Sequence, residues 1–226
     1  SSGQSPDGID AGVVLTIRLT QPDQIAPYLK DASQFSGTAD QVFLPESEKE
    51  ISEILKEANA GRIPVTVSAG RTGLAGAAVP LGGWVLSIEK LSKVLEVRKA
   101  PERHPSWARM EPALFLKDLD RILEPEELFY PPDPTGPKAL LGGTVATNAS
   151  GPNSFKYGPT RPYVRRIRVV LADGEVLDLP RGKYKAGWRR ILRIPLQSRT
   201  LKIPIPRYGW PKLKHTGGYF ASRGFD

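Results

Sequence analysis

The sequence predicts a chain of mixed α and β structure, on two observations. A short strand at 41–45, an amphipathic helix and a second strand at 63–67 follow one another in the order of a βαβ unit. Farther along, two apolar runs within 163–179 flank Ala172-Asp173-Gly174, which is typical of a β-hairpin. We therefore expect parallel strands with a right-handed crossover first, and antiparallel strands later.

The first predicted helix has a recognisable start and stop. Ser47 offers an N-cap, and Glu50 three residues later completes a capping box. An apolar stripe at i, i+3, i+4 and i+7 follows, made of Ile51, Ile54, Leu55 and Ala58. Gly61 is expected to end the helix in the C′ role.

The next elements follow in order. Residues 84–88 and 94–97 are predicted strands joined by a polar turn, and 107–111 is a weaker strand candidate. Residues 114–123 predict a short amphipathic helix that Pro125 ends. From Arg181 onward the chain is interrupted by prolines and has no clear periodicity.

Composition excludes several classes of site. The 226 residues are 39% apolar and 25% charged, as in globular proteins, and no run of 18 apolar residues predicts a membrane span. Cysteine is absent and histidine occurs twice, so disulfides and thiolate sites are excluded and we expect no metal site. We expect a cytoplasmic location, with peripheral contact to a membrane left open.

The positive charge is concentrated at the C-terminal end. Residues 181–226 hold 12 Lys and Arg against one acid, a net of +11, whereas residues 1–180 carry a net of −3. This surface could contact an acidic partner, or it could be a solvated segment or face a part of the protein outside this sequence. We favour the last two alternatives and expect no nucleic acid partner.

A loop rich in small residues follows the second predicted strand. The stretch 67–84 contains five glycines and four alanines. The three-residue spacing of Gly70, Gly73 and Gly76 does not fit a dinucleotide-binding G-x-G-x-x-G loop, and no G-K-[ST] motif occurs. A loop whose own N–H groups bind an anion remains, beside the alternative of a structural loop between subdomains.

A second region has the same character. Residues 142–151 contain no side chain larger than Val, Asn or Thr, so a flat ring could approach the backbone there. The alternative is a tightly packed helix start. The proline-rich stretch 129–137 before it is stiff and would hold one wall of a pocket. Together the two regions could bind the two ends of one elongated ligand.

Several motifs in order resemble one family. A-G-R-T-G-L-A-G at 69–76 is similar to the pyrophosphate loop of the vanillyl-alcohol-oxidase-type (PCMH-type) FAD-binding domain. The other similar segments lie at 130–135, 142–151, 156–164 and 169–174. The most similar branch contains glycolate oxidase D-subunits, D-lactate dehydrogenases and D-2-hydroxyglutarate dehydrogenases. The resemblance covers roughly 40–180 and implies an α+β fold, with a small parallel βαβ subdomain packed on a larger, mostly antiparallel sheet with flanking helices.

The resemblance also implies which residues contact FAD. The pyrophosphate would lie on the backbone of the first loop, formed by Ala69, Gly70, Arg71, Thr72 and Gly73, with Gly76 and Ala77 beside it. Pro132 and Asp133 would border the cofactor. The flavin end would contact Gly142, Gly143, Thr144, Val145, Thr147, Asn148, Ser150, Gly151, Tyr157, Gly158 and Thr160. Because Thr72 stands where covalently flavinylated relatives carry histidine, we expect non-covalent FAD.

The resemblance divides the chain into segments. We expect an N-terminal extension at 1–36, an FAD-binding domain at 37–180 with subdomains 37–98 and 99–180, and a basic segment at 181–226. The last part, 211–219, resembles the family's P-x-x-K-N-x-A-G-Y segment, with His215 in place of Asn and Gly217 in place of Ala. In relatives a substrate domain follows, and we expect this chain to lack it and to turn over little alone.

The sequence assigns no catalytic residue. Asp133 could serve as a carboxylate, but a turn between prolines is favoured, and a loop role is favoured for His215. Two functional hypotheses remain. The first is the FAD-binding portion of an enzyme that oxidises a 2-hydroxy acid by hydride transfer to flavin, with no electron acceptor assigned. The second is a non-catalytic module with a decayed flavin site and a basic partner-binding surface.

Overall fold

The computed structural model describes residues 16–101, 104–132, 136, 138–209 and 220. In chain order the elements are β1 (Ile17–Leu19), α1 (Pro22–Ile25), η1 (Ala26–Tyr28), β2 (Gln41–Leu44), α2 (Glu48–Ala60), β3 (Val65–Ser68), β4 (Trp84–Ser87), β5 (Val94–Arg98), β6 (Trp107–Met110), α3 (Leu116–Leu123), η2 (Glu124–Glu126), α4 (Leu141–Thr147), α5 (Ser154–Tyr157), η3 (Arg161–Tyr163), β7 (Arg166–Val170), β8 (Val176–Pro180), β9 (Ile191–Pro195) and β10 (Thr200–Pro204). Among these residues no helix is both long and apolar enough to cross a bilayer.

The first part of the chain forms a four-stranded sheet in the order β1-β2-β4-β3. Both β2 and β3 pair in parallel with β4, so the predicted βαβ unit is confirmed, with β4 lying between its two strands. β1 pairs antiparallel with β2 at the edge. Val42 and Val85 are buried on one face of the sheet, and Phe43 and Leu86 on the other. Burial on both faces explains why these strands read as continuous apolar runs.

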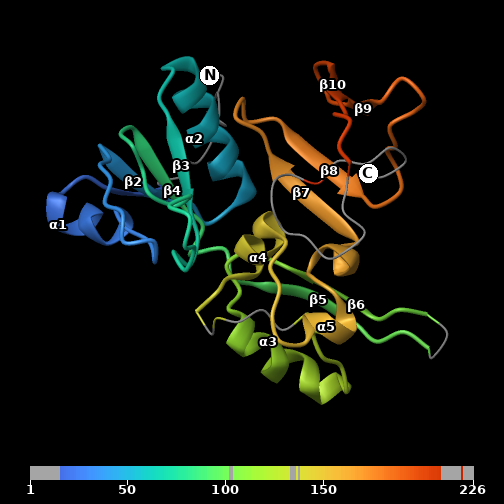
Figure 1. The fold of residues 1–226 in the computed structure, drawn as a ribbon. Coiled ribbons are helices and arrows are strands. Elements are labelled where there is room, and N and C mark those ends of the chain that lie inside the picture. The colour runs from blue at the N-terminus through green and yellow to red at the C-terminus, as the bar shows by residue number, and fades with distance from the viewer. Residues whose placement is uncertain (1–15, 102–103, 133–135, 137, 210–219, 221–226) are drawn as a thin grey trace, which may run out of the picture.

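Helices and turns cover both faces of this sheet. α2 lies against one face and begins at the predicted capping box, where the Ser47 hydroxyl accepts a hydrogen bond from the Glu50 N–H at 3.2 Å. Ile25 and Tyr28, from α1 and η1, cover the other face. Figure 1 shows this N-terminal segment in blue beside β2 and β4. The segment that the sequence reading treats as an extension thus contributes core residues, and the domain limits stay a prediction.

The end of α2 differs from expectation. Gly61 has a right-handed φ of −80°, and the left-handed residue is Arg62, with φ 53°. The Ile63 N–H reaches back to the Ala58 carbonyl at 2.8 Å, which is the six-to-one bond of a Schellman motif with Arg62 at C′. The prediction that Gly61 occupies C′ is therefore wrong by one residue.

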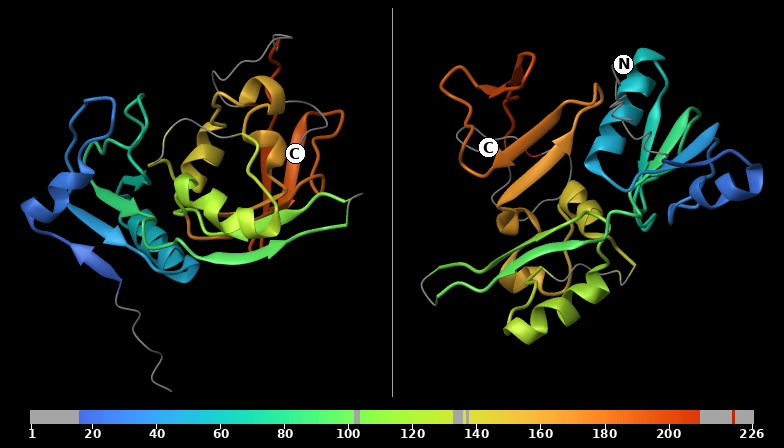
Figure 2. Two further views of the ribbon diagram at one scale, coloured as in Figure 1. Left: turned by 90° about the horizontal axis from the view of Figure 1, so that it is seen from below. Right: turned by 180° about the vertical axis from the view of Figure 1, so that it is seen from behind.

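The described residues after β4 form three separate two-stranded antiparallel ribbons, β5–β6, β7–β8 and β9–β10, and not one larger sheet. α3 packs Leu119 and Leu123 against Val97 and Met110 of the first ribbon. The predicted hairpin at 163–179 is confirmed as β7–β8. The β9–β10 ribbon, where the sequence shows no clear periodicity, stands at the opposite end of the molecule from β1 (Figure 2). The α+β fold class is confirmed.

Two contacts join the parallel sheet to the later ribbons. On one side α2 lies along β7–β8 (Figure 1), where Arg168 binds Glu48 through two hydrogen bonds of 2.7 Å and the Ser52 hydroxyl donates to the Gly174 carbonyl at 2.6 Å. On the other side Leu140, just before α4, is buried in the same core cluster as the sheet. The loop that leaves β3 lies next to this second contact.

Candidate functional site

The glycine-rich loop after β3 is an irregular, largely exposed segment. Residues 72–75 are exposed, and Leu74 keeps 81% of its surface accessible. Arg71 and Gly76 have left-handed φ values of 53° and 73°. A left-handed residue costs Arg71 backbone energy that glycine would not incur, so some feature of the fold must hold it there.

The backbone N–H groups of this loop are unpaired within the described part of the chain. None of residues 70–77 donates a backbone hydrogen bond to another described residue, although the Arg71 carbonyl accepts from Ala32 N–H at 3.1 Å and the Gly76 carbonyl from Val79 N–H at 3.1 Å. Buried or bound backbone donors require a partner. Successive N–H groups without protein partners are the kind of donors from which an anion-binding nest can be built.

The Arg71 side chain is fixed by several contacts. Its guanidinium donates to the Ser68 hydroxyl at 3.2 Å and to the Ala69 carbonyl at 3.4 Å, and it stacks 4.8 Å from the centre of the Tyr28 ring. Tyr28 in turn donates to Glu89 at 3.1 Å. Burial, together with the Glu89 charge, raises the pKa of Tyr28 to about 12. The cation is thereby held at the base of the loop.

The structure brings the two small-residue regions into contact. A Cβ on Gly70 would lie 2.6 Å from the Lys138 carbonyl oxygen, and a Cβ on Gly143 would lie 3.9 Å from that of Ala69. Gly70 is therefore required by close approach of two backbone segments. The predicted pyrophosphate loop and the predicted flavin-contacting segment thus form one continuous surface.

The second region begins as the short helix α4, so the packed helix start that we considered is present at 141–147. Gly142 packs on Pro112, where a Cβ would meet the proline side chain at 2.6 Å. The hydroxyls of Thr144 and Thr147 donate to helix carbonyls at 2.8 and 2.9 Å. The helix ends at Asn148, which is left-handed with φ 49°.

Two buried polar atoms after α4 have no hydrogen-bond partner in the described part of the chain. They are Asn148 Nδ2 and Ser150 Oγ. The side-chain oxygen of Asn148, Oδ1, already accepts a hydrogen bond from the Arg161 N–H at 2.9 Å. Each buried unpaired donor carries a desolvation cost, so a donor pair of this kind fits a ligand rich in acceptors, such as a flavin ring.

The remaining predicted flavin-side residues form a supporting wall. Thr160 is buried and donates its hydroxyl to the Ala149 carbonyl at 2.8 Å. The Tyr163 hydroxyl donates to the Tyr157 carbonyl at 2.8 Å. Gly158 has φ 82° and ψ −178°, a combination that glycine alone adopts readily.

The other predicted positions divide into three groups. Pro132 is buried, while Thr72, Gly73 and Ala77 are exposed on the first loop. Val145 and Gly151 are half-buried. Asp133, and the C-terminal motif with His215, lie outside the described residues. Within the described ranges no cluster of three or more His, Asp and Glu side chains could hold a metal.

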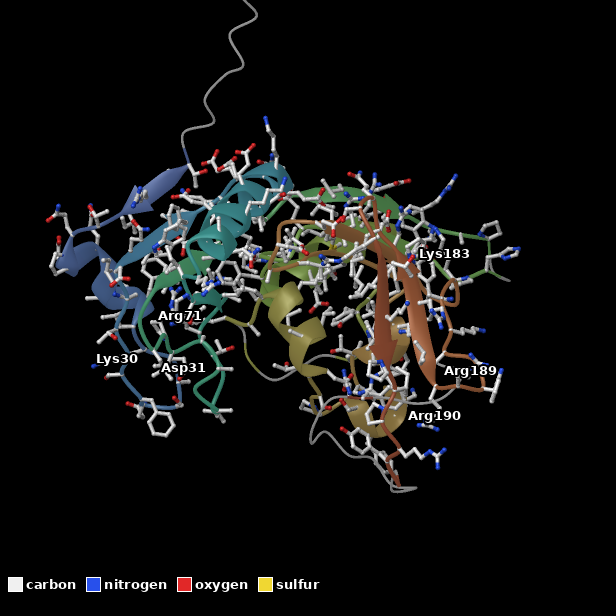
Figure 3. The ribbon with its side chains drawn as sticks, turned by 90° about the horizontal axis from the view of Figure 1, so that it is seen from above. Lys30, Asp31, Arg71, Lys183, Arg189 and Arg190 are labelled. Atoms are coloured by element: carbon white, nitrogen blue, oxygen red, sulfur yellow. The ribbon has the colours of Figure 1, made fainter. Side chains whose placement is uncertain are left out.

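The sequence reading missed the N-terminal segment that borders the loop. Asp31 is buried, with its Oδ2 unpaired among the described residues, and lies 4.0 Å from the Cβ position of Gly73. A Cβ on Gly76 would lie 3.1 Å from the Phe35 ring, so Phe35 covers this glycine. Figure 3 shows Asp31 and Arg71 side by side. The sequence signal for this segment was Asp31, since an aspartate side chain can accept from the backbone N–H two residues on in an Asx turn.

Comparison with known proteins identifies the family. The family described as FAD binding domain matches residues 39–180. A D-lactate dehydrogenase of Anaerostipes hadrus is 42% identical over 59% of this chain, and the glycolate oxidase subunit GlcD of Bacillus subtilis is 35% identical over 66%. The aligned regions make up 27% and 32% of those relatives, so the chain spans about a third of their length.

Solved structures agree on the fold. An alkyldihydroxyacetonephosphate synthase superposes with a TM-score of 0.63 at 21% identity, over 72% of this chain and 32% of its own. The chain therefore belongs to the family of FAD binding domains, and its cofactor is FAD.

Proposed function

We propose that this chain is the FAD-binding portion of a flavin-dependent oxidoreductase that oxidises a 2-hydroxy acid. The observation that carries the proposal is the run of unpaired N–H groups at 70–77, in contact with the α4 region. Relatives named as D-lactate dehydrogenase and glycolate oxidase subunit support the substrate class. When bound, FAD would supply the acceptor for the hydride that leaves C2 of the hydroxy acid.

In this proposal the two regions have separate tasks. The backbone of 69–73, with Gly76 and Ala77, binds the pyrophosphate, and the Arg71 cation at the base of the loop favours the negative charge. Asn148 Nδ2 and Ser150 Oγ donate to acceptors on the flavin end. These residues bind and orient the cofactor. The substrate and the electron acceptor are recognised by parts of the protein beyond these residues.

Absorption spectroscopy of the purified chain tests the proposal. After incubation with FAD and gel filtration, we expect visible flavin bands to elute with the protein. Because Thr72 replaces the histidine of covalently flavinylated relatives, acid precipitation should leave the yellow colour in the supernatant. A colourless protein that fails to take up FAD would overturn the function. Colour in the acid pellet would overturn the non-covalent attachment alone.

A second candidate function is contact with an acidic partner through the β9–β10 ribbon. Arg193 and Lys202 face each other across the two strands, and like charges directly opposite destabilise a ribbon unless an anion screens them. A hollow of about 250 Å³ adjoins them, lined by Lys185, Gly187, Trp188, Arg189, Ile191 and Arg193. Arg189 stacks on the exposed Trp188 ring at 4.9 Å. Figure 3 shows Lys183, Arg189 and Arg190 gathered at this end.

Binding to an acidic polypeptide measures this second candidate. Poly-glutamate should change the tryptophan fluorescence of the wild-type chain, to which the exposed Trp188 contributes, and the pair of changes Arg193→Gln and Lys202→Gln should weaken binding severalfold. The matched control replaces Lys49 and Lys90, exposed lysines on the first part of the chain. Equal loss in both double variants would indicate only general charge attraction. A cytoplasmic location, proposed from the absence of cysteine, fits both candidates.

A further inference from the structure

Asp31 presents a buried carboxylate with one oxygen occupied and one free. The side chain belongs to a residue that is 9% exposed. Its Oδ1 accepts hydrogen bonds from the Ser33 hydroxyl and from the Ser33 N–H, the latter at 2.9 Å. Its Oδ2 has no partner with full hydrogen-bond geometry among the described residues, although the Ala78 N–H lies close enough to the carboxylate to help lower its pKa. The Asx turn therefore fixes the carboxylate and leaves Oδ2 directed elsewhere.

The free oxygen faces the anion-binding loop. Oδ2 lies 4.0 Å from the Cβ position of Gly73, in the middle of 70–77. The neighbouring Ala32 N–H donates to the Arg71 carbonyl at 3.1 Å, which ties the Asp31 segment to the same loop. Figure 3 shows Asp31 close to Arg71. The segment thus forms a wall of the site, and Oδ2 is an acceptor on that wall.

The charge of Asp31 limits what can bind there. The Ser33 hydroxyl lowers the pKa of the Asp31 carboxyl below its ordinary value, in opposition to burial, so the group is ionised near neutral pH. Arg71 forms no ion pair with it, since that guanidinium is held by Tyr28 and Ser68. An ionised carboxylate repels phosphate, and it can accept hydrogen bonds but cannot donate them. The ligand group that suits Oδ2 is therefore an uncharged donor next to a diphosphate.

FAD carries such donors, because sugar hydroxyls lie on both sides of its diphosphate. We propose that Asp31 is a cofactor-binding residue whose Oδ2 accepts a hydrogen bond from a sugar hydroxyl of FAD. The inference rests on the proposed function and deepens it. Asp31 would then distinguish a dinucleotide, which brings a hydroxyl to Oδ2, from a bare phosphate anion, which brings only negative charge.

Affinity measurements on the cofactor-free chain test this selectivity. The probes are FAD, followed by flavin fluorescence, and inorganic pyrophosphate, followed by calorimetry. Asp31→Asn should weaken FAD by about tenfold or more, the usual range for losing a hydrogen bond to a charged group. The same change should leave pyrophosphate binding unchanged or tighter, because it removes a repulsive charge. Asp40→Asn, an exposed acid nearby, is the matched control and should change neither.

The outcomes separate the alternatives. Equal weakening of FAD and pyrophosphate would mean that Asp31 only supports the loop, and would overturn the inference. Unchanged FAD affinity would overturn it as well. Failure of the wild-type chain to bind FAD would overturn the proposed function, and the inference with it. If Asp31→Asn does not fold, Ser33→Ala, which releases Oδ1 while keeping the carboxylate, should weaken FAD severalfold and spare pyrophosphate.

Discussion

The loop at 69–77 and the segment at 141–151 have nearly the same composition and opposite construction. The first is irregular, exposed and free of backbone hydrogen bonds from its N–H groups at 70–77 to other described residues. The second folds into α4 and satisfies its threonine hydroxyls on its own carbonyls. Small residues keep the main chain of the first segment accessible, whereas in the second they let a helix pack closely on Pro112.

The difference indicates two modes of recognition. The first segment offers main-chain donors, which a substitution other than proline removes only if it moves the backbone. The second offers side-chain donors on Asn148 and Ser150, which single substitutions remove without moving the backbone. Changes in the first segment should therefore lower folding stability and FAD affinity together, and changes in the second should lower FAD affinity alone.

Gly70→Ala should have the largest effect. The new Cβ would lie 2.6 Å from the Lys138 carbonyl oxygen, so the two segments must move apart. Such overpacking lowers the free energy of unfolding by about 1–3 kcal/mol. Each kcal/mol lowers the melting temperature by about 2–4 °C in a chain of this size. FAD affinity should fall at least about tenfold, since the pyrophosphate loop moves. Calorimetric melting and FAD titration measure both, with Gly187→Ala as control because its Cβ meets nothing within 4 Å. Normal stability in Gly70→Ala would contradict the close approach.

Asn148→Asp should separate binding from folding. Aspartate keeps the oxygen that accepts from Arg161 N–H and tolerates the left-handed φ of 49°, but it loses the free Nδ2 donor. FAD affinity should fall about tenfold, and the melting temperature of the cofactor-free chain should stay within a few degrees. Asn59→Asp, an exposed position on α2, is the matched control. An unchanged FAD affinity would mean that Nδ2 does not contact FAD.

The elements that were predictable from the sequence are those with local signals. The capping box Ser47-Glu50 and the apolar stripe of α2 locate that helix to within a residue. Ala172-Asp173-Gly174 locates the β7–β8 turn, where Gly174 has φ 79°. The end of α2 shows the limit of a local signal, because the bond from Ile63 moves the left-handed position from Gly61 to Arg62.

The features that could not be predicted from the sequence depend on long-range packing. Tyr28 and Asp31 lie in a segment without apolar periodicity, and only the tertiary fold brings them to the loop after β3. The β9–β10 ribbon was missed because prolines and charges interrupt the alternation that marks a strand. The two glycine-rich regions could be recognised by composition and resemblance. Their contact through Gly70 and Lys138 could not, because it depends on where two backbones meet.

Gly143→Ala should sharpen the comparison through a smaller effect. Its Cβ would stand 3.9 Å from Ala69, an ordinary contact, and alanine in a helix interior is favoured over glycine by about 0.5–1 kcal/mol. The cofactor-free chain should therefore melt at the same temperature or slightly higher. FAD should bind severalfold more weakly, because the methyl group occupies space that the resemblance gives to the flavin end. A variant that gains stability and keeps full FAD affinity would mean that Gly143 does not contact the cofactor.

Tyr28→Phe should have a small effect with a distinctive pH dependence. Loss of the 3.1 Å hydrogen bond to Glu89 should cost about 1 kcal/mol, while the ring stays in place to support Arg71. Because the fold raises the pKa of Tyr28 from 10.0 to about 12, this residue contributes stability that is complete below pH 10 and is lost as pH rises through 12. Melting curves between pH 8 and pH 12 should show a steeper alkaline decline in the wild-type chain than in Tyr28→Phe.

The control is Tyr184→Phe, because the Tyr184 ring lies beside Lys183 on the basic segment, and this variant should retain the wild-type decline. Equal alkaline declines in wild type and Tyr28→Phe would mean that Tyr28 is not held neutral by the fold, and that the base of the first loop is more open to water than its contacts indicate.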